Sequence, residues 1–247
     1  MSDIVPDAHR LQELRELVAQ ACRVLAHRRV VDTVLGHVSC RVGPDTMLLR
    51  CRGPEEKGLR FTTARDVRLV HLDGSPAEDD RGYSPPNEHP IHGETLRHRP
   101  EVTAVVHAHP PAVVACSIAR LDLQPIFGSF NIPAMRMALS GVPVYDRSVL
   151  IRRPDLAAEM LAAMGSARGC VLAGHGTTVV GASVEEAVIA TLDLSALAEM
   201  TLTVAGAGRS AVPIPPQDVA ELPDLGSELN LRSLWRYYVA AAEADGF

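Results

Sequence analysis

Apolar residues recur every three or four positions between Leu11 and Arg28. This spacing predicts an amphipathic helix, because it lines one face of a chain with 3.6 residues per turn. Short β-prone runs separated by Gly, Pro and Asp follow, and they predict antiparallel hairpins through about Asp73: GHVSCRV, TMLLRC and VRLVHLD. Residues 75–87 are rich in Pro, Asp, Glu and Gly, which predicts a polar loop.

Helical and strand patterns alternate in the rest of the chain. Residues 88–98 predict a short helix, and EVTAVVHAHP predicts a buried strand. Residues 111–118 predict a helix, because proline is tolerated in the first turn of a helix. Residues 149–164 predict a further helix and GCVLAG a strand. Ser183 with Glu186 three residues later predicts the capped start of a helix to about Val204, and LRSLWRYYVAAAEA predicts the last helix.

These elements predict an α/β fold built as one domain over residues 1–247, with a C-terminal extension from about residue 207. The chain shows no internal repeat and no linker between independent cores. A single domain of this length buries about 70–75% of the surface of its unfolded chain. We therefore expect one large core.

Composition narrows the possible partners and the compartment. The formal net charge is −6, which argues against nucleic acid or an anionic membrane as the main partner. No signal-like segment opens the chain and no run of about 18 uncharged apolar residues occurs, so we expect a soluble, cytoplasmic protein. Five cysteines stand singly, which predicts reduced core residues rather than disulfides or a zinc cluster: Cys22, Cys40, Cys51, Cys116 and Cys170.

The motif VVHAHPP at residues 105–111 places His107 and His109 two residues apart after an apolar run. On a strand, both imidazoles leave the same face of the sheet. Each would cost roughly 1–3 kcal/mol if buried without a partner, and a divalent metal accepts both as ligands. The alternative is a pair of strand histidines hydrogen-bonded to backbone. His175 also follows an apolar run, and it stands between Gly174 and Gly176. Its alternative role is that of a plain turn residue.

Three neutral imidazoles leave a coordination position open, as a catalytic site requires, so we expect one divalent ion per subunit, Zn²⁺ or Mn²⁺ with Co²⁺ possible. A fourth protein ligand would make the site structural. Glu88 stands between Pro86 and Pro90, and a stiffly held carboxylate there suits proton transfer, whereas the alternative is a solvated loop residue. Nearby, His92 predicts a buried, hydrogen-bonded helix residue and His89 a residue facing water.

Basic residues near these motifs suggest an anionic small-molecule substrate. Arg50 and Arg52 are two apart, so a strand would present two planar donor groups on one side. Arg41 and Arg136 are further candidates. Surface arginines on an edge strand are the alternative.

The motifs GHVSCR, VHLDG, PPNEH, VVHAHPP and GHGTTV together make the chain resemble the class II aldolase/adducin family from about Leu11 to Ala205. The resemblance implies a three-layer α/β/α fold around a mainly antiparallel sheet. It also implies a homotetramer with active sites between subunits, metal ligation by His107, His109 and His175, and an acid/base or metal-shielding role for Glu88.

Departures from the family pattern point to one branch. Sugar-phosphate members carry Asn where this chain has His37. They also carry small hydroxyl-rich loops where it has CRGPEEKG and Pro86-Asn87, so the sequence does not indicate a phosphate-binding loop. With PIFGSFNIPAM and Arg153-Pro154, the pattern resembles decarboxylases of hydroxylated aromatic dicarboxylates such as dihydroxyphthalate. The expected activity is a metal-dependent, non-oxidative decarboxylation. Glu88 or His37 would protonate the ring carbon, with substrate contacts from Ser39, Arg41, Arg52 and Arg136.

Two other functions stay open from sequence. One is a metal-dependent retro-aldolase acting on a hydroxy-acid or sugar phosphate through the same residues. The other is a non-catalytic assembly protein like the adducin head, which predicts lost ligands, whereas all three histidines are present. Tyr145, Tyr237 and Tyr238 are candidates to reach a neighbouring active site, and their alternative role is packing.

Overall fold

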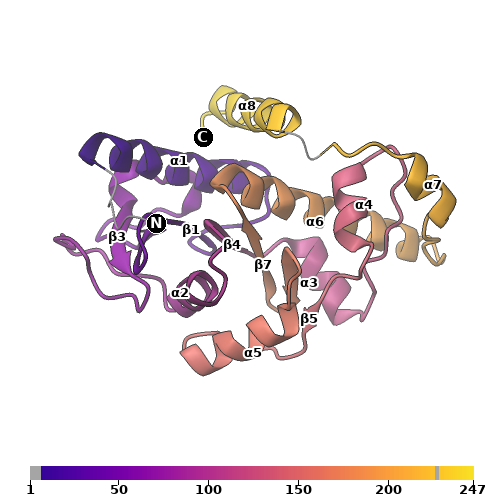
Figure 1. The fold of residues 1–247 in the computed structure, drawn as a ribbon, viewed down its shortest axis with the longest axis horizontal. Helices are drawn as coiled ribbons and strands as arrows, with labels where there is room; N and C mark the ends of the chain where they lie inside the picture. The colour runs from indigo at the N-terminus through magenta and orange to yellow at the C-terminus, as the bar shows by residue number, and fades with distance from the viewer. Residues whose placement is uncertain (1–6, 226–227) are drawn as a thin grey trace.

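The computed structural model describes residues 7–225 and 228–247, and its centre is a seven-stranded sheet (Figure 1). The strand order is β3-β2-β1-β4-β7-β6-β5. Every neighbouring pair is antiparallel except β5 and β6, which run parallel. The strands are β1 (His37–Arg41), β2 (Thr46–Arg50), β3 (Val67–His71), β4 (Ala104–Ala108), β5 (Val144–Tyr145), β6 (Gly169–Leu172) and β7 (Gly176–Gly181).

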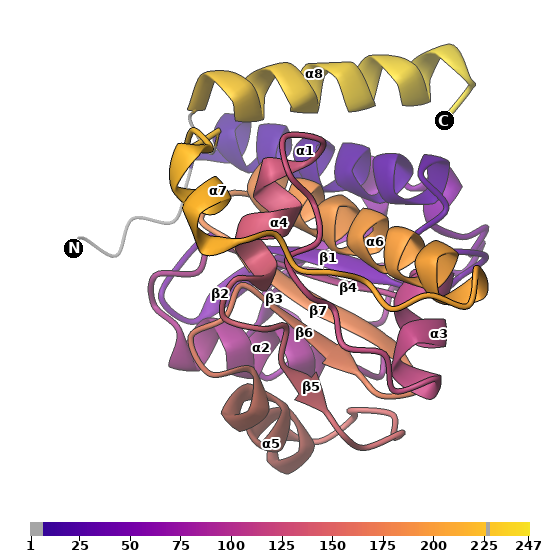
Figure 2. The ribbon, with the colours of Figure 1, turned by 90° about the vertical axis from the view of Figure 1, so that its right-hand side faces the viewer.

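Helices cover both faces of the sheet (Figure 2). One face carries α1 (Ala8–His27), α3 (Pro111–Ile118), α4 (Ile132–Ala138) and α6 (Val184–Gly206), and the other carries α2 (His89–His98) and α5 (Pro154–Met164). Two short 3₁₀ turns, η1 (Leu59–Phe61) and η2 (Ala64–Asp66), lie between β2 and β3. The predicted α/β/α layering around a mainly antiparallel sheet is confirmed.

Strand alternation divides the core into two sides. On β1, Val38 and Cys40 pack with α1 and α6, while Val105 of the neighbouring strand packs on the side of α2 and α5. Because side chains alternate along a strand, His37 and His107 share the α2 side of the sheet. The two histidines are also register partners across β1 and β4.

Helix α6 is long and apolar enough to cross a membrane by length and composition, but most of its apolar window is buried inside the fold. It packs against the sheet and against its neighbours α1, α3 and α4, as a core helix does. Ser183 caps its start by accepting a hydrogen bond from the Glu186 N–H at 3.2 Å. The Glu186 carboxylate reaches back to the N–H of Ala182 at 2.7 Å, so the predicted cap is present with a shifted return bond.

Some boundaries differ from the sequence expectation. Helix α5 begins at Pro154 rather than at residue 149, because the residue before a proline is pushed out of the helical region, and Arg153 is extended. The patterns in the sequence do not predict α4, β5 or β7. All five cysteines are free and buried, as predicted.

The chain after α6 lies outside the layers. It includes α7 (Pro216–Glu221) and α8 (Glu228–Ala244), and α8 lies over α1 (Figures 1 and 2). Trp235, Tyr238 and Val239 of α8 pack against the apolar cluster to which α1 and α6 both contribute. The C-terminal extension thus packs on the domain through apolar side chains.

Candidate metal centre

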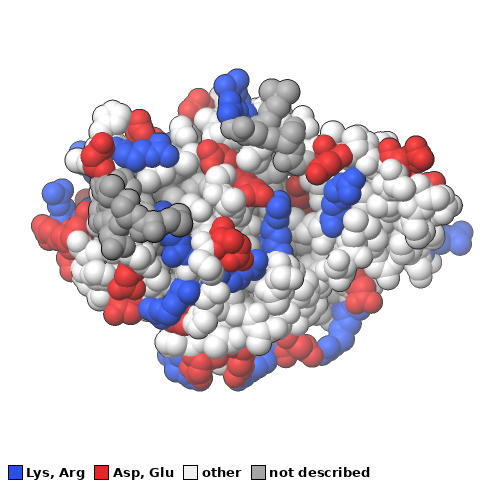
Figure 3. Space-filling model, in the orientation of Figure 1, with Lys and Arg blue, Asp and Glu red and all other residues white. Residues whose placement is uncertain are grey.

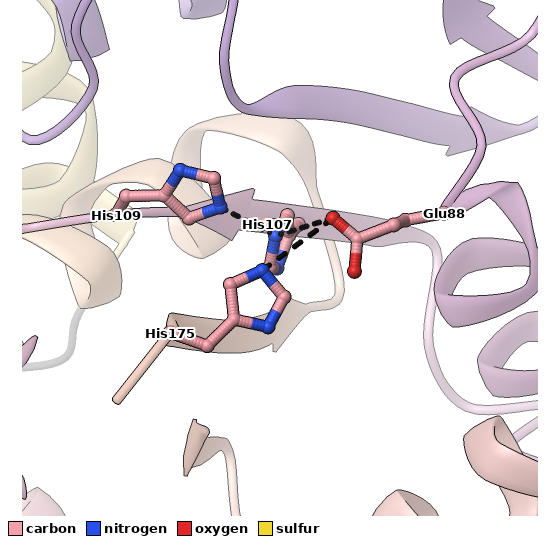
Figure 4. Close-up of side chains that lie close together, drawn as sticks. All are labelled: Glu88, His107, His109 and His175. Atoms are coloured by element: carbon pink, nitrogen blue, oxygen red, sulfur yellow. Dashed lines mark hydrogen bonds and ion pairs between the residues drawn. The ribbon is translucent and has the colours of Figure 1, made fainter. Parts of the chain in front are cut away.

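Four side chains from three separate parts of the chain converge beside the central strands (Figure 4). His107 lies in β4 and His109 directly after it, His175 lies in the turn between β6 and β7, and Glu88 precedes α2. One ligand atom from each residue lies within 4.8 Å of the other three. The structure therefore brings together the three predicted metal ligands and the predicted acid/base.

The spacing of these atoms suits a shared cation. Oε2 of Glu88 lies 3.4 Å from Nε2 of His107 and 3.5 Å from Nε2 of His175. Two ligands bound at about 2.1 Å to a tetrahedral ion lie about 3.4 Å apart. The Nε2 atoms of His107 and His109 are closer, at 2.8 Å. Three imidazole nitrogens are a donor set that fits Zn²⁺, Mn²⁺ or Co²⁺ and leaves a coordination position open, and the Glu88 oxygen beside them is placed to act as an acid/base.

The cluster is buried on one side and open on the other. Glu88 and His107 are buried, whereas His109 and His175 are partly exposed. The side of His109 and His175 is therefore the one that faces solvent. The Nδ1 atoms of His107 and His175 are buried without a hydrogen-bond partner among the described residues, so ring packing orients these side chains.

Glu88 is held by the backbone. Its Oε1 accepts a hydrogen bond from the N–H of Ile151 at 3.0 Å, which leaves Oε2 facing the histidines. Burial alone would raise the pKa of Glu88, but interactions with His107 and His175 outweigh burial and hold that pKa well below its usual range. The carboxylate is therefore ionised in the resting site. Burial, together with the neighbouring His107 and His175, lowers the pKa of His109 to about 3.

A second group of polar side chains lies behind the cluster. The His37 ring stacks on His107 with centroids 4.9 Å apart, and its Nδ1 lies 2.6 Å from Nε2 of His92. Nδ1 of His92 lies 2.7 Å from Oγ of Ser39. Burial, and then the neighbouring rings, lower the pKa of His92 to about 3 and that of His37 well below its usual value. His92 is the buried, hydrogen-bonded helix residue that the sequence predicted.

This arrangement changes the interpretation of Ser39. Its side chain is fully buried and bonded to His92, so it does not face the open side of the cluster as a substrate contact would. His37 itself lies next to the metal ligands, where we predicted a catalytic residue. His89, expected to face water, is only partly exposed, and its Nδ1 lies 3.2 Å from the carbonyl oxygen of Pro86.

Two of the predicted arginine contacts, Arg41 and Arg136, are engaged away from the cluster. Arg41 lies at the far end of β1, about 13 Å from His37 along the strand, and donates to the carbonyls of Leu96 and Val102. The bond to Leu96 reaches the last turn of α2, so the side chain is already engaged there. Arg136 donates to the Leu222 carbonyl at 2.8 Å and lines a separate cavity of about 670 Å³.

Arg50 and Arg52 have different surroundings despite their two-residue spacing. Arg50 is buried and forms an ion pair with Glu56. Arg52 is partly exposed, and its backbone bridges to Ser84, four residues before Glu88. The predicted contact of the Arg52 side chain with a substrate stays a prediction. On the face seen in Figure 3, basic and acidic side chains are interspersed, without an extended field of one sign.

The three tyrosine candidates also differ in setting. Tyr145 is buried in β5 and donates to Glu159 at 2.8 Å, so within one chain it is a packing residue. Tyr238 is packed against the core beneath α1, whereas Tyr237 is exposed.

This fold and this cluster define a class of protein. The family model described as Class II Aldolase and Adducin N-terminal domain matches residues 16–202, and the chain belongs to that family. In three dimensions it resembles an aldolase II superfamily protein from Pseudomonas syringae, with a TM-score of 0.81 and 23% identity over 95% of this chain and 94% of that one.

Closer relatives are found by sequence. The chain is 52% identical to a 3,4-dihydroxyphthalate decarboxylase from Arthrobacter keyseri, over 93% of this chain and 94% of the relative. It is 50% identical to a protein of the same name from Terrabacter sp. (strain DBF63), over 92% and 95% of the two chains.

Proposed function

We propose that this protein is a carboxy-lyase that removes carbon dioxide, without oxidation, from a hydroxylated aromatic dicarboxylate of the dihydroxyphthalate type. The observation that carries this proposal is the 52% identity to a 3,4-dihydroxyphthalate decarboxylase over nearly the whole of both chains. The converging cluster of Glu88, His107, His109 and His175 supports it, because it offers the donors that such chemistry needs.

His107, His109 and His175 would hold one divalent cation through their Nε2 atoms. When bound, such an ion lowers the pKa of a coordinated hydroxyl and stabilises negative charge that develops on oxygen during the reaction. The buried side of the cluster excludes water, and the partly exposed side admits the substrate's hydroxyl and neighbouring carboxylate.

Glu88 supplies the proton transfer in this proposal. Because its carboxylate is ionised in the resting site, it can accept the proton of the substrate hydroxyl. It then delivers that proton to the ring carbon that bears the leaving carboxylate. The bond to the carboxylate carbon breaks, carbon dioxide leaves, and the electron pair restores the aromatic ring with an anionic oxygen that water reprotonates. The Ile151 N–H holds the carboxylate in place throughout.

Product analysis tests the proposal against the retro-aldolase alternative. Metal-loaded protein is incubated with hydroxylated aromatic dicarboxylates, 3,4-dihydroxyphthalate first, and with sugar phosphates, while carbon dioxide and aldehyde are both measured. Carbon dioxide from the aromatic compounds is the expected result, and aldehyde from a sugar phosphate would refute the proposal. His107→Ala should lose both metal and turnover, so an active, metal-free variant would exclude the metal-dependent mechanism.

We also propose that the enzyme works in the cytoplasm as a homotetramer with active sites at subunit interfaces. Large apolar side chains on the surface of the single chain support self-association, among them Phe61, Ile118, Phe130 and Leu150. Four copies of a 26.5 kDa chain give about 106 kDa, which light scattering would detect. A monomeric mass with full activity would exclude a shared site.

A further inference from the structure

Three buried side chains form a hydrogen-bonded line that ends beside the metal cluster. His92 of α2 stands in the middle, 2.6 Å from His37 on one side and 2.7 Å from Ser39 on the other. Ser39 and His92 have no exposed surface and His37 only 4%. Because both ring nitrogens of His92 are engaged, its orientation is fixed.

The number of donors and acceptors in these three side chains decides which group donates in each hydrogen bond. The Ser39 hydroxyl has one hydrogen, and His92 is its only hydrogen-bond partner among the described residues. If the hydroxyl accepted a proton from His92, its own hydrogen would be buried without an acceptor, at a cost of roughly 1–3 kcal/mol. The hydroxyl therefore donates to Nδ1 of His92.

The direction then passes along both rings. A neutral His92 that accepts at Nδ1 carries its proton on Nε2, and donates it to Nδ1 of His37. A neutral His37 that accepts at Nδ1 in turn carries its proton on Nε2. Nε2 of His37 has no hydrogen-bond partner among the described residues and is not among their fully buried unpaired atoms, so this N–H keeps some exposed surface next to the stacked His107 ring.

We propose that Ser39 and His92 are positioning residues that fix His37 as a neutral N–H donor, which binds an anionic oxygen of the substrate beside the metal cluster. The inference rests on the proposed function only for the identity of that oxygen, a carboxylate or phenolate. A neutral imidazole N–H is a good hydrogen-bond donor and a very weak acid. His37 therefore orients the substrate, and Glu88 is left as the proton donor to carbon.

Nitrogen-15 NMR of the histidine rings tests the tautomers without any activity measurement. The zinc-loaded protein, labelled in histidine, should show His37 and His92 both protonated at Nε2 and unprotonated at Nδ1. The signals are assigned by their loss in His37→Asn and His92→Asn. A proton on Nδ1 of either ring in the wild-type protein would overturn the inference, and this outcome is independent of whether the decarboxylation itself is found.

Ser39→Ala tests the positioning role by kinetics. Loss of the terminal donor should raise KM about fivefold, with a smaller change in kcat, an unchanged metal content and mixed tautomers at His92. Ser39→Thr, which keeps a hydroxyl, should restore the wild-type tautomers. Ser195→Ala is the matched control, because it removes another buried hydroxyl, bonded to Glu199 on α6, and should leave KM unchanged. Wild-type KM and tautomers in Ser39→Ala would refute the role.

Discussion

Gly176 provides a test of how the chain shapes the metal centre. It follows His175 directly and begins β7. A Cβ at this position would lie 2.3 Å from the carbonyl oxygen of Ala108 and 2.7 Å from Cδ2 of His109. Ordinary contacts begin at 3.4 Å, so in Gly176→Ala the contact with the Ala108 carbonyl must open by about 1.1 Å and the contact with the His109 ring by about 0.7 Å.

Such a shift exceeds what coordination tolerates. Ligand distances in metal sites hold to about 0.2 Å, so displacement of His109 weakens binding even when the fold survives. We expect metal affinity to fall by about 10–100-fold, which is about 1.4–2.8 kcal/mol. Overpacking should also lower the free energy of unfolding by about 1–3 kcal/mol.

Zinc titration in competition with a chromophoric chelator measures the affinity, and urea unfolding measures the stability. Gly169→Ala is the matched control, because it also adds a methyl group at the start of a strand, and its nearest contact would be an ordinary 3.6 Å. A folded Gly176→Ala protein with wild-type zinc affinity would refute the idea that this glycine sets the position of His109.

Three further predictions concern α2. Glu88→Gln should keep the metal but reduce turnover by about 10²–10⁴-fold, measured as carbon dioxide release, and unchanged kinetics would assign the proton transfer elsewhere. Burial lowers the pKa of His92 from its ordinary value of 6.5 to about 3 in the folded protein, so the unfolded chain binds more protons between these two values. As the pH falls from 6.5 towards 3, this residue should lower the free energy of unfolding of the metal-free protein by about 1.4 kcal/mol per pH unit. Urea unfolding at a series of pH values measures this dependence, and in His92→Asn the free energy of unfolding should change less steeply with pH. Gly93→Ala would place a Cβ 1.8 Å from the Leu72 carbonyl oxygen and should cost about 3 kcal/mol or more, whereas Gly206→Ala, with open space around it, should not destabilise the fold.

Local patterns in the sequence predicted most of the fold because periodicity and end signals are local properties. The first helix, the strands of the opening hairpins and the long capped helix all appear close to where the sequence placed them. β7 was not predicted, because the glycines on both sides of His175 are typical of a loop. Pairing with β4 and β6 on its two sides makes the following residues a central strand.

In the candidate site, too, only the features that depend on local spacing could be predicted from the sequence. His107 and His109 could be predicted as a pair, because their two-residue spacing already places them on one face of a strand. The partners of Ser39 and Arg41 could not, because they come from α2 and the turn after it, some fifty to sixty residues away. A serine and an arginine near a motif look like substrate contacts until the elements that engage them are known.

Helix α2 links the two halves of the proposed chemistry. Glu88 at its start and His92 within it are four residues apart, so they lie on the same side of the helix. One reaches the metal cluster and the other reaches His37. The close approach of Gly93 to the Leu72 carbonyl allows α2 to sit against the end of β3. Because a single rigid element carries both groups, Glu88 and the His92 ring that positions His37 keep a fixed relative position, and a shift of α2 would displace both together.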